Sequence, residues 1–284
     1  MSHLYKPLRF ALTAYHGCRR ALQQSEAIGS VAAGVNLMLL PTAGVMWALG
    51  GLTSPRGRSF TWDTRADGYA RSEACSTVAL RPTPIAAGMS VVDASGSAVQ
   101  QDGRSASLTA PNGQAQQAVL VAAMRDAAMQ ANVLALNQAH GTGTALGDPI
   151  EAGSLVAAVL SAREEVLAIG GVKANIGHAE PAAGMTGLVE LVLGLRGGEA
   201  TSNALLRVLN PHVESTFRVR CALGVQVDEV VTEARGGGVS SFGYSGTITH
   251  AVLACRSASE RAALASHLKT GLVYRRRRAR DAHA

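Results

Sequence analysis

Residues 140–155 read HGTGTALGDPIEAGSL and place a histidine on a Gly-Thr loop that leads directly into a helix. Glycine loses more conformational entropy on folding than other residues, so its repeated use indicates a loop that something approaches closely. We predict Asp148 as the helix N-cap, Pro149 as the first helical residue and Glu151 as the reciprocal acceptor of a capping box. The stretch therefore predicts that a rigid scaffold holds His140 on a loop.

Segments typical of strands and of helices alternate around this stretch. Alternation of this kind is typical of a layered α/β fold in which helices cover a buried sheet, with catalytic groups on loops at strand ends. Short apolar runs predict a strand at 133–140 that ends at His140, and a strand within 166–178 that delivers Lys173 and then His178 on a glycine-bearing loop. Residues 217–227, 237–246 and 249–255 predict strands and a turn. Apolar residues at helical spacing predict helices at 114–130 and 183–198, and a further helix starts at Pro149.

Length, charge and cysteine usage narrow the class of protein. The 284 residues suffice for one large or two modest domains. Much of the net charge of +6 lies in the RRRRAR run at 275–280, which we expect to be a solvated tail rather than a nucleic-acid contact. The four scattered cysteines form no CxxC pair, which favours a reducing compartment and no structural zinc.

Residues 27–55 carry almost no charge and match the length of a membrane span, about 20 residues. Pro41 and several glycines interrupt the run, so we expect no membrane insertion but a buried strand at 30–39 that runs into a loop. No signal peptide is visible at the N-terminus. We therefore expect a cytoplasmic protein, with targeting to an organelle left open.

His140 and His178 each follow an apolar strand on a glycine-bearing loop. A single histidine of this kind is usually a satisfied polar residue near the core, and that alternative stays open for each. A metal site is a poor fit because neither HExxH nor Cys/His spacing is present, and residues 170–175 lack the phosphate-binding GxxxxGK[ST] pattern. Two neutral imidazoles can instead stabilise a developing oxyanion, a chemistry that normally uses a nearby cysteine nucleophile.

Several segments resemble β-ketoacyl synthases, most closely the ketosynthase domains of modular type I polyketide synthases. The C-terminal signatures of that family resemble AHGTGTALGDPIEA (139–152), GGVKANIGHAEPAAGMTGLVELVLGLR (170–196) and GGVSSFGYSGTITHAVL (237–253). Further blocks resemble, in the same order, VAAGVNLML (31–39), SFTWDTRADGYARSEACSTVAL (59–80) and GSAVQQDGRSASLTAPNGQAQ (96–116).

The resemblance implies a thiolase-like α/β fold of α-β-α-β-α layers, built from two related halves and usually forming a homodimer. It extends from about His16 to about Cys255. We expect an incomplete N-terminal half at 1–82, a near-complete C-terminal half at 83–256 and a disordered basic tail at 257–284.

The resemblance implies decarboxylative Claisen condensation as the reaction. An acyl chain is held as a thioester on cysteine, and a malonyl-type extender arrives on the phosphopantetheine arm of an acyl carrier protein. The implied partners are therefore the acyl carrier protein and acyl and malonyl thioesters, with no cofactor bound directly.

The family's functional residues carry over by position. His140 and His178 match the two catalytic histidines, which assist decarboxylation and hold the enolate and thioester oxygens. Lys173 matches the lysine associated with them, which either tunes their charge or forms a structural ion pair. The substrate-binding matches are Thr142 and Thr144, for the pantetheine arm, and Phe242 and Tyr244, in the turn that gates the acyl pocket; packing alone is the alternative for Phe242.

The family's cysteine lies in an ACSSS motif at the head of a helix, which the alignment puts near Leu8, where YKPLRFAL lacks the motif. Cys18 lies two to three turns into that helix, away from the dipole that activates a thiolate. We therefore expect condensation to be lost and decarboxylation of a malonyl thioester to be retained. The alternatives are a non-catalytic scaffold that pairs with a full ketosynthase, and a truncated gene model.

Overall fold

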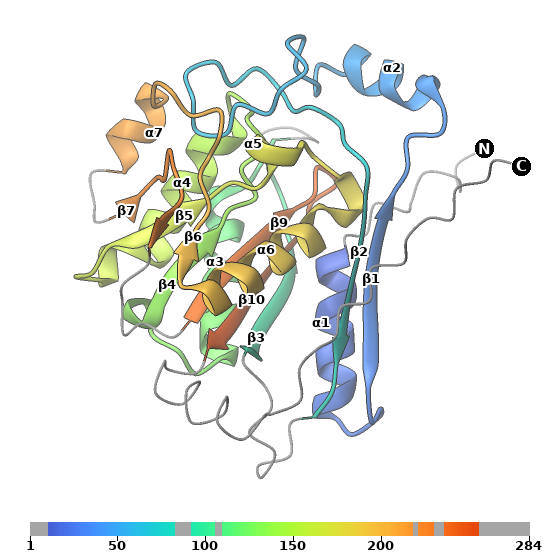
Figure 1. Cartoon of the computed structure of the whole chain (residues 1–284), viewed down its shortest axis with the longest axis vertical. Helices are drawn as coiled ribbons and strands as arrows, with labels where there is room; N and C mark the ends of the chain where they lie inside the picture. Colours follow the sequence, from blue (N-terminus) through green and yellow to red (C-terminus); the bar gives the residue numbers. More distant parts are fainter. Residues whose placement is uncertain (1–10, 83–91, 106–109, 218–220, 230–235, 256–284) are drawn as a thin grey trace, which may run out of the picture.

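The computed structural model describes residues 11–82, 92–105, 110–217, 221–229 and 236–255 (Figure 1). The helices are α1 (Ala11–Gln23), α2 (Pro41–Leu49), α3 (Gly113–Asp126), α4 (Gly147–Ala158), α5 (Lys173–Ile176), α6 (Ala183–Gly197) and α7 (Pro211–Thr216). The strands are β1 (Ser30–Asn36), β2 (Ala74–Leu80), β3 (Val92–Gln101), β4 (Leu134–Gln138), β5 (Leu167–Gly170), β6 (Glu199–Ala200), β7 (Cys221–Ala222), β8 (Asp228–Glu229), β9 (Gly236–Phe242) and β10 (Thr247–Cys255).

A six-stranded mixed sheet in the order β3-β10-β9-β4-β5-β7 forms the centre of the molecule. β10 pairs antiparallel with both β3 and β9, whereas β4 runs parallel to both β9 and β5. Because β4 and β5 are parallel neighbours, the loops that follow them leave the sheet at the same end. This topology alone brings the segments that follow the two strands together.

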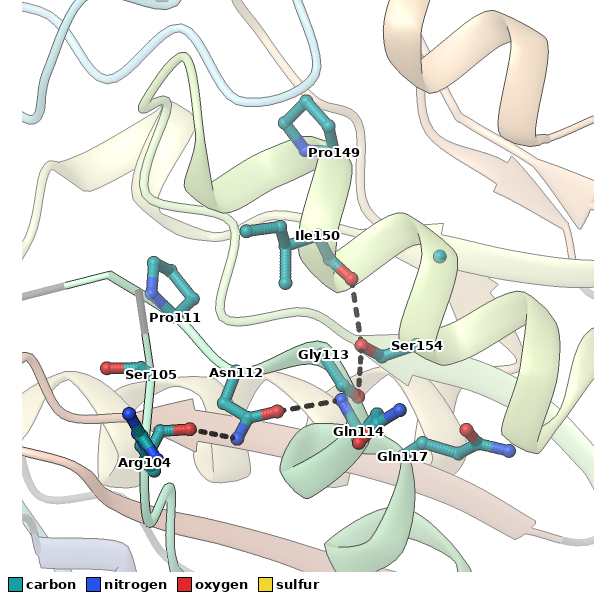
Figure 2. Close-up of a pocket in the computed structure, with 11 residues that line it drawn as sticks. Arg104, Ser105, Pro111, Asn112, Gly113, Gln114, Gln117, Pro149, Ile150 and Ser154 are labelled. Carbon is teal, nitrogen blue, oxygen red and sulfur yellow. Dashed lines mark hydrogen bonds between the residues drawn. The ribbon is translucent and has the colours of Figure 1, made fainter. Parts of the chain in front are cut away.

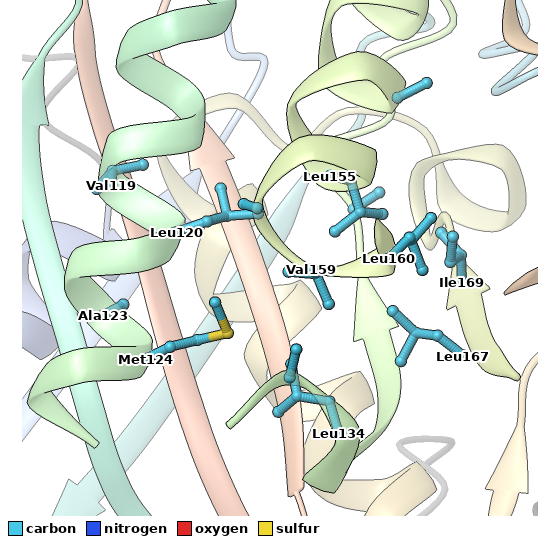
Figure 3. Close-up of a cluster of buried hydrophobic side chains, with 14 of the residues drawn as sticks. Val119, Leu120, Ala123, Met124, Leu134, Leu155, Val159, Leu160, Leu167 and Ile169 are labelled. Atoms are coloured by element: carbon cyan, nitrogen blue, oxygen red, sulfur yellow. The ribbon is translucent and has the colours of Figure 1, made fainter. Parts of the chain in front are cut away.

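Two hydrophobic cores cover the two faces of this sheet. On one face α3 and α4 pack through side chains such as Leu120 and Leu155 (Figure 3). On the other face α1 and α6 pack through side chains such as Leu12 and Leu188. Strand β10 contributes to both cores, because successive side chains of a strand point to opposite faces of the sheet. Ile248 belongs to the first core, and Ala251, on the opposite face of the strand, belongs to the second.

The sequence of α6 explains why this helix lies against the sheet. Met185, Leu188, Leu191 and Leu195 recur at helical spacing and are all buried. At the start of α3, the Asn112 side chain accepts hydrogen bonds from two backbone amides of the first turn, which is the role of an N-cap. The helices predicted at 114–130 and 183–198 are thus confirmed.

The antiparallel pair β1–β2 packs on the outer side of α1 and α6 (Figure 1). The described residues therefore stack as α3/α4, the six-stranded sheet, α1/α6 and β1–β2. This order, α-β-α-β, follows four of the five predicted layers.

One expectation about residues 27–55 is wrong. Strand β1 forms, but its residues alternate between buried and exposed, so it is not a buried strand. The strand runs into a loop at 37–40 as expected, and helix α2, which was not predicted, follows with none of its residues buried. Among the described residues, no helix combines the length and the apolar character needed to cross a membrane.

The strand predicted at 217–227 is reduced to the two residues of β7 within the described part of that segment. The basic tail expected at 257–284 lies outside the described residues.

Candidate active site

His140 lies two residues beyond β4, on the loop that precedes α4. Gly143 on this loop has φ of +77°, and a Cβ there would lie 2.6 Å from the backbone nitrogen of Phe60. A side chain at this position would be excluded both by its backbone conformation and by the crossing chain. The predicted close approach is therefore confirmed, and the approaching group is the protein's own backbone.

The roles predicted for Asp148 and Glu151 in capping are wrong. Helix α4 begins at Gly147 after Leu146, whose side chain makes no capping bond, so Asp148 and Pro149 already lie inside the first turn. Asp148 accepts hydrogen bonds from the amides of Trp62 and Gly143 at 2.8 and 3.0 Å. The two carboxylates therefore hold loops rather than their own helix end.

Glu151 acts on the histidine loop itself. Its two carboxylate oxygens accept hydrogen bonds from the backbone amides of His140 and Gly141, at 2.6 and 2.7 Å. This bidentate contact fixes the backbone that carries the imidazole. Sequence spacing alone could not separate this role from capping, because both roles need an acidic residue near the start of the helix.

His178 follows β5 through the short helix α5 and Gly177, which has φ of +80°. Its backbone is bound on both sides by the segment before β2: its amide donates to Ala70 O at 2.7 Å, and its carbonyl accepts from Ser72 N at 3.0 Å. The Tyr69 ring packs edge-on against the imidazole with centroids 4.8 Å apart. His178 is therefore held between two segments far apart in sequence.

The two imidazoles lie together. Their ring centroids are 5.7 Å apart and their planes are nearly perpendicular. Nδ1 of His140 accepts from the amide of Phe242 at 3.3 Å, and Nδ1 of His178 accepts from the amide of Glu180 at 2.9 Å. Because an accepting Nδ1 leaves the proton of a neutral imidazole on Nε2, each ring keeps an Nε2–H donor.

Both imidazoles are neutral at pH 7. Burial lowers the pKa of His140 and of His178 well below 6.5, and the nearby Lys173 ammonium lowers both pKa values further. The site thus holds two uncharged donors, which suits an oxygen that gains negative charge during a reaction.

Lys173 is buried behind His140 and donates a hydrogen bond from Nζ to the His140 carbonyl oxygen. Burial lowers the pKa of Lys173, and the carboxylates of Glu151 and Asp148 oppose that shift. Burial likewise raises the pKa values of the two carboxyls. The lysine therefore acts on the loop and on the local charge rather than by lining the cavity.

A cavity of about 460 Å³ is lined by His140, His178, Thr142, Thr144, Phe242 and Tyr244. These are all the predicted catalytic and substrate-binding residues except Lys173. The hydroxyl oxygens of the two threonines lie 3.2 Å apart. One cavity therefore joins the histidine pair to the threonine-bearing loop.

Aromatic side chains line two sides of this cavity. Phe242 is buried, with its ring 5.5 Å from that of His140. Tyr244 is 42% exposed and packs edge-on against Trp47 of α2 at 5.3 Å. The structure thus adds Trp47 and Tyr69 to the site; the matched block at 59–80 contained Tyr69 without singling it out.

A second hollow of about 610 Å³ lies beside the N-terminal turns of α3 and α4 (Figure 2). Two of the polar side chains around it already have partners: Asn112 caps α3, and the Ser154 hydroxyl contacts the carbonyl oxygens of Gly113 and Ile150. Arg104 is the one charged side chain among its described lining residues. The candidate site is therefore the cavity that holds the histidines.

No cysteine belongs to the described lining of the histidine cavity. Cys18 is half-buried on α1, and the aligned position near Leu8 lies outside the described residues. A Cβ placed on Gly34 would lie 2.5 Å from Ala11 and 2.9 Å from Ala182, so the first turn of α1 reaches the chain just after His178. Within the described residues, no three His, Cys, Asp or Glu side chains gather as metal ligands would.

Comparison with known proteins identifies the family. The model described as "Beta-ketoacyl synthase, N-terminal domain" matches residues 11–86, and the model described as "Beta-ketoacyl synthase, C-terminal domain" matches residues 91–206. A phenolphthiocerol/phthiocerol polyketide synthase of Mycobacterium tuberculosis is 40% identical over 251 residues, 86% of this chain and 11% of that protein. Erythronolide synthase EryA2 of Saccharopolyspora erythraea is 37% identical over 89% of this chain and 7% of that protein.

Solved structures agree. The ketosynthase from module 6 of the bacillaene synthase of Bacillus subtilis 168 superposes with a TM-score of 0.82 and 28% identity over 87% of this chain and 46% of that chain. The oxazolomycin ketosynthase domain OzmH KS7 of Streptomyces albus JA3453 superposes with a TM-score of 0.82 and 31% sequence identity, over 87% of this chain and 45% of that chain. The chain thus spans about a tenth of these polyketide synthases and under half of these ketosynthases. The predicted thiolase-like α/β fold is confirmed, and the chain belongs to the beta-ketoacyl synthase family, as a ketosynthase domain of the type I polyketide synthase kind.

Proposed function

We propose that this chain carries the decarboxylation site of a ketosynthase that condenses an acyl thioester with a malonyl-type extender on acyl carrier protein. The observation that supports the proposal best is the pair of neutral imidazoles at one cavity, each with Nδ1 occupied by a backbone amide. The centroids of the two rings lie 5.7 Å apart. A pair of Nε2–H donors on rings this close suits a single oxygen that becomes negative.

The first step is loss of carbon dioxide from the malonyl thioester. The bond between the α-carbon and the carboxylate breaks, and its electron pair moves to form an enolate. His140 and His178 donate their Nε2 protons as hydrogen bonds to the enolate oxygen. The neutral state of both rings matters here, because an imidazolium would pair with the departing carboxylate and stabilise the ground state.

The extender reaches the histidines as the terminal group of a phosphopantetheine arm. The arm runs past Thr142 and Thr144, whose hydroxyls bind its amide groups, while the carrier protein stays outside the cavity. Phe242 and Tyr244 border the space for the acyl chain. No cofactor bound by this chain itself takes part.

Formation of a carbon–carbon bond also requires an acyl-cysteine near the enolate. The family's cysteine matches a position near Leu8, which lies outside the described residues and in a segment without a cysteine. Without an acyl-cysteine, the enolate takes a proton from water and leaves as the acetyl thioester. The proposal therefore separates decarboxylation, which needs the two histidines, from condensation, which needs an acyl-cysteine that none of the chain's four cysteines supplies in the described lining of the cavity.

Malonyl-pantetheine turnover tests the proposal. The protein is incubated with the thioester, and acetyl-pantetheine and carbon dioxide are quantified. We expect His140→Ala and His178→Ala each to lower the rate at least about a hundredfold, as loss of an oxyanion donor does. His212→Ala removes an exposed histidine of α7 as the matched control and should keep the wild-type rate. Equal rates in wild type and both cavity variants would refute the proposal.

A second candidate function is a partner subunit that pairs with a complete ketosynthase. It is favoured by apolar side chains exposed on and beside β1 and α2, including Val31, Leu39, Leu40 and Leu49. Such a face suits burial against another polypeptide, either a second copy in a homodimer or a full-length ketosynthase. Size-exclusion chromatography with and without a full-length ketosynthase separates these cases, since only heteromeric pairing gives a new co-eluting peak.

A further inference from the structure

An ion pair next to the cavity joins the segment before β2 to the loop of His178. Arg71 Nε and Nη2 donate to the two carboxylate oxygens of Glu180, at 2.6 and 3.2 Å. The side chains are only 13% and 9% exposed. A bidentate Arg–carboxylate contact is geometrically specific, so it fixes an orientation as well as a distance.

Glu180 is held in an unusual backbone conformation. Its φ of +44° lies in the left-handed region, which costs free energy for a residue with a side chain. The Glu180 amide donates to Nδ1 of His178 at 2.9 Å, and the φ of Glu180 sets how the carboxylate bound by Arg71 is oriented relative to that amide. The hydrogen bond to Nδ1 that leaves the His178 proton on Nε2 is thus donated by a residue with a strained backbone, and Arg71 binds the side chain of that residue.

Arg71 is in turn fixed from two directions. The backbone around it pairs with that of His178, through the bonds of Ala70 O and Ser72 N. A Cβ on Gly44 of α2 would lie 3.5 Å from Nη1, so α2 covers the guanidinium. The same short segment therefore holds both the backbone of His178 and the residue that orients its ring.

From this arrangement we propose that Arg71 and Glu180 are positioning residues that set the tautomer and orientation of His178. The ion pair holds Glu180 in the left-handed conformation, and its amide then keeps Nδ1 unprotonated and Nε2–H directed at the cavity. Neither side chain touches the substrate. The inference rests on the proposed function for its catalytic meaning, while the tautomer itself can be observed without substrate.

Long-range ¹H–¹⁵N correlation spectra of the imidazoles test the proposal, with His178→Gln used for assignment. In the wild type we expect an unprotonated Nδ1 and a protonated Nε2 for His178. Arg71→Met should shift both nitrogens toward averaged values as the two tautomers become comparably populated. Arg65→Met, which breaks the Arg–carboxylate pair with Asp63 away from the histidines, is the matched control and should leave the His178 shifts unchanged.

Arg71→Met leaves the Glu180 carboxylate buried without its partner and could unfold the chain. The double variant Arg71→Met/Glu180→Met removes both charges, keeps a similar volume and is expected to fold. The double variant should still lose the single-tautomer pattern. The conservative variant Arg71→Lys should keep that pattern only in part, because an ammonium lacks the planar fork of a guanidinium. A folded double variant with wild-type His178 shifts would overturn the proposal.

Malonyl-pantetheine turnover supplies the second readout. The double variant should lower kcat at least about tenfold and change KM by less than about twofold, because positioning acts on the transition state rather than on arm binding. Failure of the wild type to decarboxylate would refute the proposed function and leave the tautomer result standing. A normal kcat in a variant with scrambled tautomers would refute the positioning role alone.

Discussion

The six-stranded sheet and the segment formed by β1, α2 and β2 both border the site, yet they are packed very differently. Every residue of β9 and of β4 is buried, whereas β1 alternates and α2 has no buried residue. The segments that follow the sheet's strands carry the two histidines and the lysine, and helix α4 carries both carboxylates. The outer segment supplies Trp47 and Arg71, which forms the ion pair with Glu180. Most residues of the candidate site thus belong to the buried region, and the outer segment covers part of the cavity.

The largest expected effect is on stability in the sheet region. Leu134→Ala empties a position at the start of β4 that is fully buried in the core of Figure 3, and should cost about 2–5 kcal/mol in the free energy of unfolding. Leu49→Ala on α2 removes the same atoms from a side chain that is 84% exposed, and should change stability by less than about 0.5 kcal/mol. Urea denaturation measures both, and equal losses would contradict the packing difference.

A pH effect of similar size should come from His250 of β10. Burial lowers its pKa from 6.5 to about 4, so the unfolded chain binds more protons than the folded chain between these values. Stability therefore falls as the pH falls through this window, by on the order of 3 kcal/mol from this residue. His250→Gln should flatten the denaturation profile between pH 7 and 4, while His16→Gln on the partly buried α1 surface should flatten it much less.

A smaller effect is expected from the backbone crossing at the histidine loop. Gly143→Ala places a Cβ 2.6 Å from the Phe60 amide at a positive φ, which should cost about 1–3 kcal/mol and slow decarboxylation. Gly57→Ala also has a positive φ, but no atom lies within 4 Å of its added Cβ. It should cost only the backbone strain, about 1 kcal/mol, in thermal unfolding. A larger loss at Gly57 would show that strain, not the crossing, dominates.

The smallest effect concerns the contact between the two regions. Trp47 of α2 and Tyr244 of the β9–β10 turn pack edge-on at 5.3 Å. A double-mutant cycle with Trp47→Ala and Tyr244→Ala should give a coupling of about 0.5–1.5 kcal/mol in the free energy of unfolding. Additive losses would mean that α2 covers the cavity without being held by the turn.

The sequence predicted most of the buried sheet region and less of the outer segment. Periodic apolar residues identified α3 and α6, because a buried face repeats at the period of its element. Short apolar runs identified the strands that precede the histidines, and the Asp-Pro start signal identified α4. The same logic failed at 27–55, where an uncharged run predicted a buried strand, whereas β1 alternates between buried and exposed residues and the exposed helix α2 was not predicted. Composition records how apolar a segment is, whereas the packing of the rest of the chain decides whether it is covered.

Some residues of the candidate site could likewise be predicted from the sequence, and others could not. The sequence by itself determined the family, the two histidines and the threonines, because those residue types at those spacings form local motifs. Only the tertiary structure decided that Asp148 and Glu151 bind loops instead of capping α4, and that Arg71 grips Glu180. These roles join residues up to 109 positions apart, and partner choice at such separations depends on how the layers pack rather than on any local pattern.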